Sequence, residues 1–268
     1  MTLDPAPFKE RRANISNRFV TRLAQGPGDI MAAQRLRYDV FIAELGGDGS
    51  MVDHAQRLER DRFDAFADHL LLLDTARAAG DQVVGVYRLM TRDMASAAGQ
   101  FYCADEYDLS VLLGSDFRLL ELGRSCLHPD YRGGSAMLYL WAALSDYVDS
   151  HGIDVVFGVA SFHGTDPARL AQPLALLGQK YLAPAHLRVR ARGPDAVSFD
   201  QLGDADPDRL AAVRAMPALI KAYLRLGATV GEGAFVDHAF NTTDICLILE
   251  KSALRAVQHA IYTRRAAP

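Results

Sequence analysis

The sequence predicts an α/β protein in which a central, mixed but mostly antiparallel sheet is flanked by helices. Five apolar runs have the length and composition of strands, and they cover residues 69–74, 82–90, 117–127, 153–161 and 245–249. Between them, apolar side chains recur at helical spacing, most clearly over 30–40, with Asp29 as the expected N-cap, and over 136–148. The runs 69–74 and 82–90 are expected to form a hairpin, and residues 18–24 alternate like an edge strand. With 268 residues, half of them hydrophobic, the chain is long enough to bury the core of one or two domains.

Composition and charge exclude several classes of protein. The net charge of −4 argues against a nucleic acid as the partner. No apolar run reaches the length of roughly 18 residues that marks a membrane span, and the N-terminus lacks the apolar core of a secretion signal, so we expect a cytoplasmic protein. The three cysteines are expected to be reduced core thiols, with a catalytic Cys126 as the less favoured alternative. The histidines show no metal-ligand spacing, so no metal is expected.

The most informative stretch is 119–141, where an apolar run containing Glu121 and Arg124 leads into a turn and a helix. The strand breaks at residues 128–130, and the small, flexible turn 132–135 precedes the helix. Such a turn directs free backbone N–H groups and the positive end of the helix dipole at one point, which suits a phosphate. An ordinary strand–turn–helix connection is the structural alternative.

This stretch resembles the acceptor motif of the GNAT acyltransferase superfamily, in which backbone amides of the turn bind the cofactor's phosphates. Arg132, Gly133 and Gly134 match the motif, whereas Ser135 stands where the motif usually has Gly and Met137 where it has Gly or Ala. These departures favour the 4′-phosphopantetheine arm of acyl carrier protein, with its single phosphodiester, over the pyrophosphate of coenzyme A. The resemblance therefore implies an acyl-donor site, with no other cofactor bound, at Leu127, Arg132, Gly133, Gly134, Ser135 and Ala136.

A second resemblance lies upstream. Residues 36–45, LRYDVFIAEL, are similar to the first helix of the acyl-homoserine-lactone synthases, and Glu59, Asp61 and Asp64 have those enzymes' E-x-D-x-x-D spacing. Three carboxylates before an apolar strand can form a cation site, or they can belong to a charged loop. The resemblance implies substrate-binding roles for Arg37, Phe41, Asp61 and Asp64.

A third resemblance covers the C-terminal part. The segments PALIKAYLRLGA, 217–228, and D-x-x-FNTTD, 237–244, are similar to those of the bacterial L-ornithine Nα-acyltransferases. This resemblance implies transfer of a 3-hydroxyacyl group from acyl carrier protein to the α-amine of L-ornithine, which gives lyso-ornithine lipid. It also implies that Asp237, Asn241 and Asp244 face the amino acid. The structural alternative for 240–244 is a turn with an Asx cap before the last strand.

The polar residues within the strand suggest the chemistry. A carboxylate inside an apolar strand is costly unless it is paired or used, so Glu121 is expected to act as general base or amine anchor. We expect Arg124 to order the strand end, and backbone N–H groups of 125–127 to stabilise the oxyanion. The structural alternative for Glu121 is a buried ion pair with Arg124 or Arg88.

Three segments are expected along the chain: a basic N-terminal segment (1–17), a GNAT-like core (18–163) and a C-terminal extension (164–268). The locally basic residues 9–37 suggest a docking surface for acyl carrier protein or anionic lipid, or a solvated face. The basic, amphipathic stretch 251–265 suggests peripheral contact with an anionic membrane. Two other functions stay open at this point: an acyl-homoserine-lactone synthase-like enzyme and a non-catalytic module that binds acyl carriers.

Overall fold

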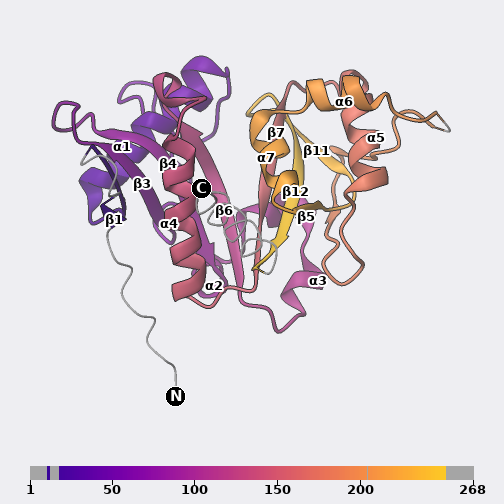
Figure 1. Cartoon of the computed structure of the whole chain (residues 1–268), viewed down its shortest axis with the longest axis horizontal. Helices are drawn as coiled ribbons and strands as arrows, with labels where there is room; N and C mark the ends of the chain where they lie inside the picture. Colours follow the sequence, from indigo (N-terminus) through magenta and orange to yellow (C-terminus); the bar gives the residue numbers. More distant parts are fainter. Residues whose placement is uncertain (1–10, 13–17, 204, 252–268) are drawn as a thin grey trace, which may run out of the picture. The chain divides into compact units, whose positions relative to one another are not determined.

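The structure is a computed structural model that describes residues 11–12, 18–203 and 205–251. The chain forms two compact units (Figure 1), each with its own strands and helices. The first unit comprises the chain up to Tyr102 together with Leu120–Ile153, and the second comprises Cys103–Leu119 and the chain from Asp154 onward. These units are defined by contacts between residues, and each combines separate stretches of the chain. The expected division into the continuous segments 1–17, 18–163 and 164–268 stays a prediction.

The sheet of the first unit consists of antiparallel strands. Their order is β1 (Arg11–Arg12), β2 (Phe19–Leu23), β3 (Asp68–Asp74), β4 (Val83–Thr91) and β6 (Leu119–Leu127). The predicted hairpin of β3 and β4 is confirmed. The expectation that residues 18–24 form an edge strand is wrong, because β1 pairs with the outer side of β2.

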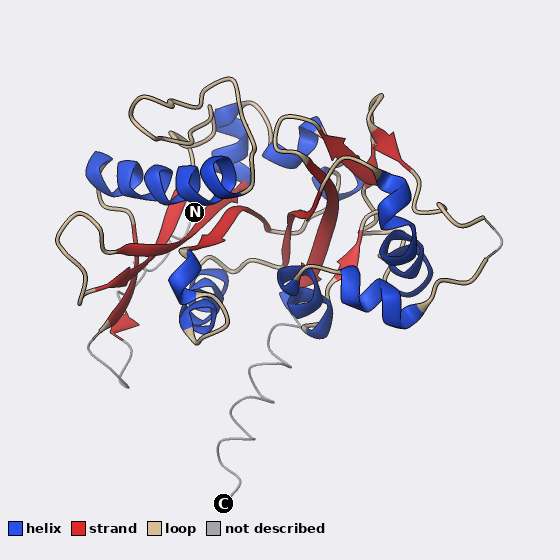
Figure 2. Ribbon diagram, turned by 90° about the horizontal axis from the view of Figure 1, so that it is seen from above, coloured by secondary structure: helices blue, strands red, loops and turns tan. Residues whose placement is uncertain are grey.

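The strand β3 is buried on both faces, which explains its unbroken run of leucines. Leu71 and Leu73 belong to the cluster formed with α1 (Pro27–Arg37). Leu72 points the other way, and both it and Leu140 of α4 (Ala136–Ser150) approach Gly85. Successive side chains of a strand face opposite sides, so helices cover both sides of this sheet, as Figure 2 shows.

The first helix begins earlier than expected. Its N-cap is Gly26 and Pro27 occupies the first turn, a position that suits a residue without a backbone N–H. The expected cap, Asp29, instead lies within the first turn, where its carboxylate accepts a hydrogen bond from the Gln25 amide. The helix continues as a π-helical segment, η1 (Tyr38–Glu44), a form often found at functional sites.

The main sheet of the second unit is also antiparallel. Its strands are β7 (Val155–His163), β12 (Thr242–Glu250), β11 (Ala234–Asp237) and β9 (Ala196–Val197), with β10 (Thr229–Val230) beside β12. A separate pair joins β5 (Tyr107–Asp108) to β8 (Arg190–Ala191). The last long strand starts at Thr242, earlier than the predicted residue 245, so Asp244 lies inside it.

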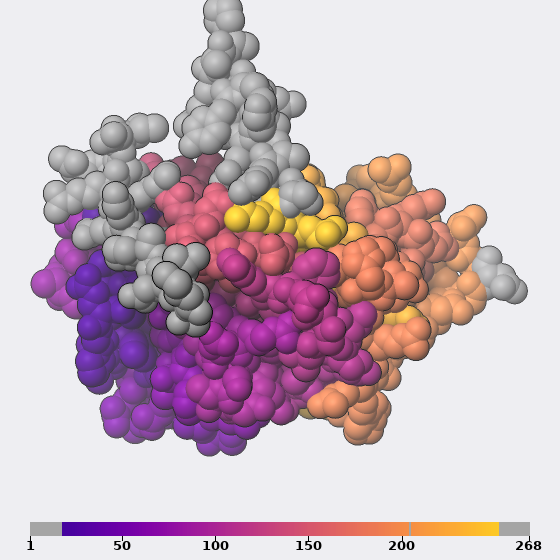
Figure 3. Space-filling model, turned by 90° about the horizontal axis from the view of Figure 1, so that it is seen from below, coloured from indigo at the N-terminus to yellow at the C-terminus, as the bar shows by residue number. Residues whose placement is uncertain are grey.

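Short helices complete both units. They are α2 (Arg92–Ala98), η2 (Tyr102–Asp105), α3 (Ser110–Leu113), η3 (Pro129–Tyr131), α4 (Ala136–Ser150), η4 (Pro167–Leu170), α5 (Ala171–Lys180), α6 (Arg209–Ala215) and α7 (Ala218–Arg225). In Figure 3 the orange surface of the second unit comes from the segment between β7 and β11. Among the helices described, none is long and apolar enough to cross a bilayer. Apart from Lys251, the amphipathic stretch predicted over 251–265 lies outside the described residues, as does most of the basic segment 1–17.

Candidate active site

The strand–turn–helix unit predicted around residues 119–141 is confirmed. The strand β6 ends at Leu127, and α4 begins at Ala136 after an exposed turn. Gly133 adopts a φ of 74°, in the left-handed region that only glycine enters without strain. The first N–H groups of a helix have no partner within the helix, so the turn leaves donors that can bind an anion.

Arg132 fixes the turn to the rest of the first unit. Its Nη1 and Nη2 atoms donate to the two carboxylate oxygens of Glu44 at 2.6 and 2.7 Å, and its Nε donates to the carbonyl of Leu127 at 3.2 Å. These hydrogen bonds lower the pKa of Glu44. The Arg132 side chain is still 41% exposed. It therefore lies at the surface beside the turn, with its orientation fixed by Glu44 and the Leu127 carbonyl.

Glu121 lies deep in β6, opposite Met90 of β4, and is only 3% exposed. Its Oε2 atom accepts a hydrogen bond from the backbone N–H of Tyr102 at 2.9 Å. The side chain of Arg124 extends to two other carboxylates, Glu59 at 3.1 Å and Asp61 at 3.0 Å. The predicted catalytic pair therefore occupies one strand, and Tyr102 lies close to both side chains, through its backbone N–H to Glu121 and its ring beside Arg124.

A β-bulge separates Glu121 from the phosphate turn. The register between β4 and β6 pairs Arg88 with Gly123 and Val86 with Cys126, so β6 has one residue more than β4 at this point. Arg124 takes up the extra length with a φ of 50°, unusual for a residue with a Cβ. Bulges redirect side chains and interrupt pairing next to active sites. Here the bulge releases Arg124 and Ser125 from the ladder with β4.

Six charged side chains form a buried network behind this bulge, which we call the ion network. It consists of Arg37, Arg88, Arg124, Glu59, Asp61 and Asp64. Arg37 pairs with Glu59 and, at 2.8 Å, with Asp64. Arg88 reaches Asp61 at 2.6 Å and Asp64 at 3.0 Å. Three cations thus balance three anions, as burial of charges requires.

The ion network keeps its carboxylates ionised. Burial alone would raise the pKa of Asp64, but the attraction of Arg37 and then of Arg88 outweighs it and holds the pKa well below its usual range. The pKa of Glu59 is lowered in the same way, chiefly by Arg124 against the effect of burial. The network is therefore a fixed set of charges, in which the carboxylates accept hydrogen bonds at neutral pH.

The predicted substrate-binding residues of the first unit are brought together by this geometry, except for one. Arg37, Asp61 and Asp64 are members of the ion network, whereas Phe41 packs on the apolar cluster of α1 and β3. Arg37 is 0% exposed, so its assignment to a basic docking surface over 9–37 is wrong. Direct contact of these residues with a substrate stays a prediction.

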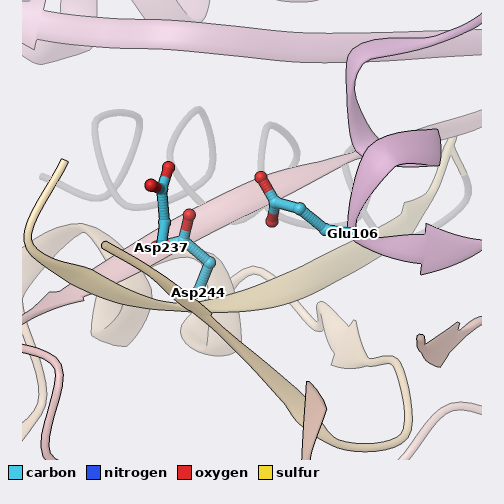
Figure 4. Close-up of side chains that lie close together, drawn as sticks. All are labelled: Glu106, Asp237 and Asp244. Carbon is cyan, nitrogen blue, oxygen red and sulfur yellow. The ribbon is translucent and has the colours of Figure 1, made fainter. Parts of the chain in front are cut away.

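A second cluster of carboxylates lies wholly within the second unit. Glu106, Asp237 and Asp244 approach one another within 4.8 Å through their carboxylate oxygens, as Figure 4 shows. Glu106 is 4% exposed and Asp244 is 3% exposed, whereas Asp237 is half-buried. Three oxygens at this spacing can hold a cation or a hydrogen-bond donor, and the expectation that the protein has no metal stays a prediction.

Asn241 turns the chain between β11 and β12. It has a φ of 53°, and its carbonyl accepts from the Gly164 amide at 2.8 Å. Asp237 caps the same turn, since its Oδ1 accepts from the amides of Ala239 and Phe240 at 2.8 and 3.1 Å. An Asx-capped turn is thus present, but its cap is Asp237 and β12 already begins at Thr242, so the alternative placed over 240–244 is only partly confirmed. Recognition of the amino acid by Asn241 stays a prediction.

Cys126 is a core thiol. It is 5% exposed, and burial raises its pKa to about 12, so the nucleophilic thiolate is scarce at neutral pH. All three cysteines are buried and free, as expected.

Several members of these clusters were not predicted as site residues. Glu59 was the first acid of the E-x-D-x-x-D spacing, and Arg88 was a charged residue in an apolar strand, a signal equal to that of Glu121. Tyr102 places its ring 4.7 Å from the Arg124 guanidinium and 5.5 Å from that of Arg88. Glu106 had no local signal, since it lies in a short polar segment before Tyr107.

The chain was compared with known proteins. Residues 36–142 match the acetyltransferase (GNAT) domain family. The chain is 55% identical to an L-ornithine N(alpha)-acyltransferase of Rhodobacter capsulatus, over 91% of this chain and 94% of that protein. Enzymes of the same name from Brucella abortus and Rhizobium meliloti are 43% and 39% identical, over 85% and 91% of this chain and 83% of each relative.

Among solved structures, an N-acyl amino acid synthase from uncultured soil microbes shares the fold. Its TM-score is 0.51 at 15% identity, over 89% of this chain and 94% of that one. The predicted fold class is therefore confirmed. By sequence, fold and the strand–turn–helix unit of β6 and α4, the chain is an acyltransferase and belongs to the L-ornithine N(alpha)-acyltransferase family.

Proposed function

We propose that this enzyme transfers a 3-hydroxyacyl group from the 4′-phosphopantetheine thioester of acyl carrier protein to the α-amine of L-ornithine, and so makes lyso-ornithine lipid. The acceptor is supported by relatives that are named for ornithine and match the chain almost from end to end. The observation that carries the proposal is the bulged strand β6 leading into the turn at Gly133, in a chain so similar to those relatives.

The reaction needs no activation step, because the thioester is already reactive. The neutral α-amine attacks the thioester carbonyl, a C–N bond forms and the C–S bond breaks. The nitrogen loses a proton, and the thiol of the arm leaves with one. Since an α-amine has a pKa of about 8, a base that takes its proton raises the rate by ~10²–10⁴. Glu121 is the proposed base or amine anchor, acting directly or through an ordered water.

The bulge supports the proposed role of the β6 backbone. The register with β4 pairs Gly123 and Cys126 but neither Arg124 nor Ser125, so the backbone at Ser125 can turn its N–H toward the thioester carbonyl. A donor already in place where the oxyanion develops stabilises the transition state without reorganisation. The ion network holds Arg124 on the far side of the bulge, which fixes the local backbone direction.

The proposed donor follows from the chemistry of the turn. Ser135 stands in place of a motif glycine, and Arg132 is already bound to Glu44 by two hydrogen bonds. A single phosphodiester asks for fewer donors than a pyrophosphate does, so the arm of acyl carrier protein suits this turn better than coenzyme A.

The test compares the same 3-hydroxyacyl chain on acyl carrier protein and on coenzyme A, with L-ornithine as acceptor and mass detection of the product. We expect a higher kcat/KM with the carrier protein, and a value that falls as salt rises, because the carrier is acidic. Equal efficiency on both donors without salt dependence contradicts the proposed donor. Product from another amino acid in place of ornithine contradicts the proposed acceptor.

A further inference from the structure

The carboxylate cluster of the second unit is assembled from separate parts of its fold. Asp237 ends β11, Asp244 lies inside β12, and Glu106 comes from the chain just before β5. Figure 4 shows the three side chains directed into one space. Like charges this close repel strongly in a buried environment, so this arrangement suits a positively charged ligand.

The backbone holds Glu106 in this cluster independently of its carboxylate. The adjacent Tyr107 is fully buried, and its hydroxyl lies 3.0 Å from two backbone carbonyls, those of Gly233 and Asp244. The carbonyl of Glu106 itself accepts from the Arg192 amide at 2.9 Å. Burial, reinforced by the nearby acids, raises the pKa of Tyr107 well above its usual value, so the hydroxyl remains a donor. The backbone contacts of Glu106 and Tyr107 therefore fix the position of Glu106 in the cluster.

A neutral polar group on the same side of the sheet points to a ligand. The register pairs Thr242 with Asp237, and Asp244 follows two residues later on the same face. Thr242 is 8% exposed, and within the described parts of the chain its buried Oγ1 has no hydrogen-bond partner. Buried hydroxyls are normally satisfied, so a group absent from the free protein would complete it.

This face of the sheet is also open at one side. Ser161 and His163 of β7 pair with Asp244 and Thr242, and both are exposed, whereas Phe162 between them is buried on the opposite face. A small ligand can therefore approach the carboxylates along the polar face without unfolding either strand.

We propose that Glu106, Asp237 and Asp244, together with the Oγ1 of Thr242, bind the distal ammonium group of the acceptor amino acid. The inference rests on the proposed function for its ligand, ornithine. A primary ammonium has three N–H donors and no acceptor, which matches a set of oxygens from several directions. One oxygen of Asp237 also accepts hydrogen bonds from two backbone amides. A carboxylate shared in this way suits an ammonium group better than a metal ion.

The consequence is selectivity for a charged side chain. L-norvaline has the same carbon skeleton as L-ornithine but lacks the distal nitrogen, so it offers these carboxylates and the Thr242 hydroxyl no N–H donor. Sites built to bind a polar group strongly reject the analogue that lacks it. Glu106 thereby contributes to selection of the acceptor amino acid, whose α-amine attacks the thioester.

The test measures equilibrium binding of L-ornithine and L-norvaline to the full chain without acyl donor, by calorimetry. The variants are Glu106→Gln and Asp237→Asn, and the control is Glu232→Gln, whose side chain is 47% exposed and pairs with Arg190 on the surface. We expect each cluster variant to weaken ornithine binding about tenfold to a hundredfold, the range for a charge-assisted hydrogen bond, and to leave norvaline binding unchanged. The control should alter neither.

Equal losses for both ligands, or no loss for ornithine in the more exposed Asp237→Asn, would overturn the inference. So would a stoichiometric site for Mn²⁺ or Ca²⁺ that disappears in Glu106→Gln while ornithine affinity is kept. If the free chain binds neither amino acid, the effect of each variant on ornithine relative to norvaline is measured instead as kcat/KM for each acceptor with the acyl donor present. A chain that binds ornithine in the expected pattern but takes no acyl group from acyl carrier protein contradicts the proposed donor alone.

Discussion

Replacement of Arg88 by methionine should reveal how far the fold of the first unit depends on the ion network. Arg88 is 2% exposed, and its Nη1 contacts both oxygens of Asp61 at 2.6 Å and one oxygen of Asp64 at 3.0 Å. The network then holds three carboxylates and two guanidinium groups, so one buried negative charge loses its balance. Methionine fills most of the space, so lost packing adds little.

The expected magnitude follows from that imbalance. Removal of one partner of a buried ion pair costs about 3–5 kcal/mol, and the lower end applies because Asp61 keeps Arg124 and Asp64 keeps Arg37. At about 2–4 °C per kcal/mol for a chain of this size, the melting temperature should fall by about 6–12 °C. Urea denaturation followed by circular dichroism gives the same free energy from the midpoint and slope.

A matched control and a second substitution sharpen the test. Arg57→Met removes an ion pair of the same unit with Asp39 at 2.5 Å, whose side chains are 59% and 48% exposed, and should lower the melting temperature far less than Arg88→Met does, because solvent screens exposed charges. Adding Asp64→Asn to Arg88→Met restores the charge balance and should return part of the loss, as a coupling of about 0.5–3 kcal/mol. Equal losses from Arg88→Met and Arg57→Met, or no coupling with Asp64, would refute the reasoning.

Two further predictions concern the turn and the pH dependence. Gly133→Ala places a Cβ at a φ of 74° and should cost about 1–2 kcal/mol while raising KM for the acyl donor; Gly80→Ala, with a φ of 92° in the β3–β4 hairpin, should cost as much in melting temperature without changing that KM. Stability should fall with pH in two stages. Burial lowers the pKa of His69, so its contribution is complete above about pH 6.5 and is lost as pH falls; the lowered pKa of Asp64 adds a second loss below about pH 4. A melting temperature that rises between pH 6.5 and pH 3 would contradict both.

The features that sequence could predict are those with a local signature. The leucines of β3 and the polar residues inside β6 are readable from a short window, and so is the change from strand to glycine turn to helix at Gly133. For the same reason the hairpin of β3 and β4 could be placed correctly.

The features that sequence could not predict depend on pairing between distant residues. Arg124 was expected to order the strand end, with an ion pair to Glu121 as a structural alternative. At the bulge its side chain contacts Glu59 and Asp61, and a one-residue change of register leaves no mark in composition. The cluster with Glu106 escaped prediction because its members come from segments that only the sheet of the second unit brings together. The boundary of β12 was missed because Asn241 and Asp244 resemble loop residues although the strand already begins at Thr242.

Glu121→Gln distinguishes a catalytic carboxylate from a structural one. Glutamine keeps the oxygen that accepts from the Tyr102 amide at 2.9 Å, so the contact that positions the side chain in β6 survives while the charge is lost. If Glu121 takes the proton from the attacking amine, kcat should fall by ~10² or more with the melting temperature preserved. The deficit should shrink as pH rises toward the amine's own pKa of about 8, because hydroxide and water then supply the neutral amine. If Glu121 only balances buried cations, the melting temperature should fall and the shape of the pH–rate profile should not change. A stable variant with near-normal kcat at pH 7 would remove Glu121 from the mechanism, and the proton would then have to leave through solvent or another carboxylate.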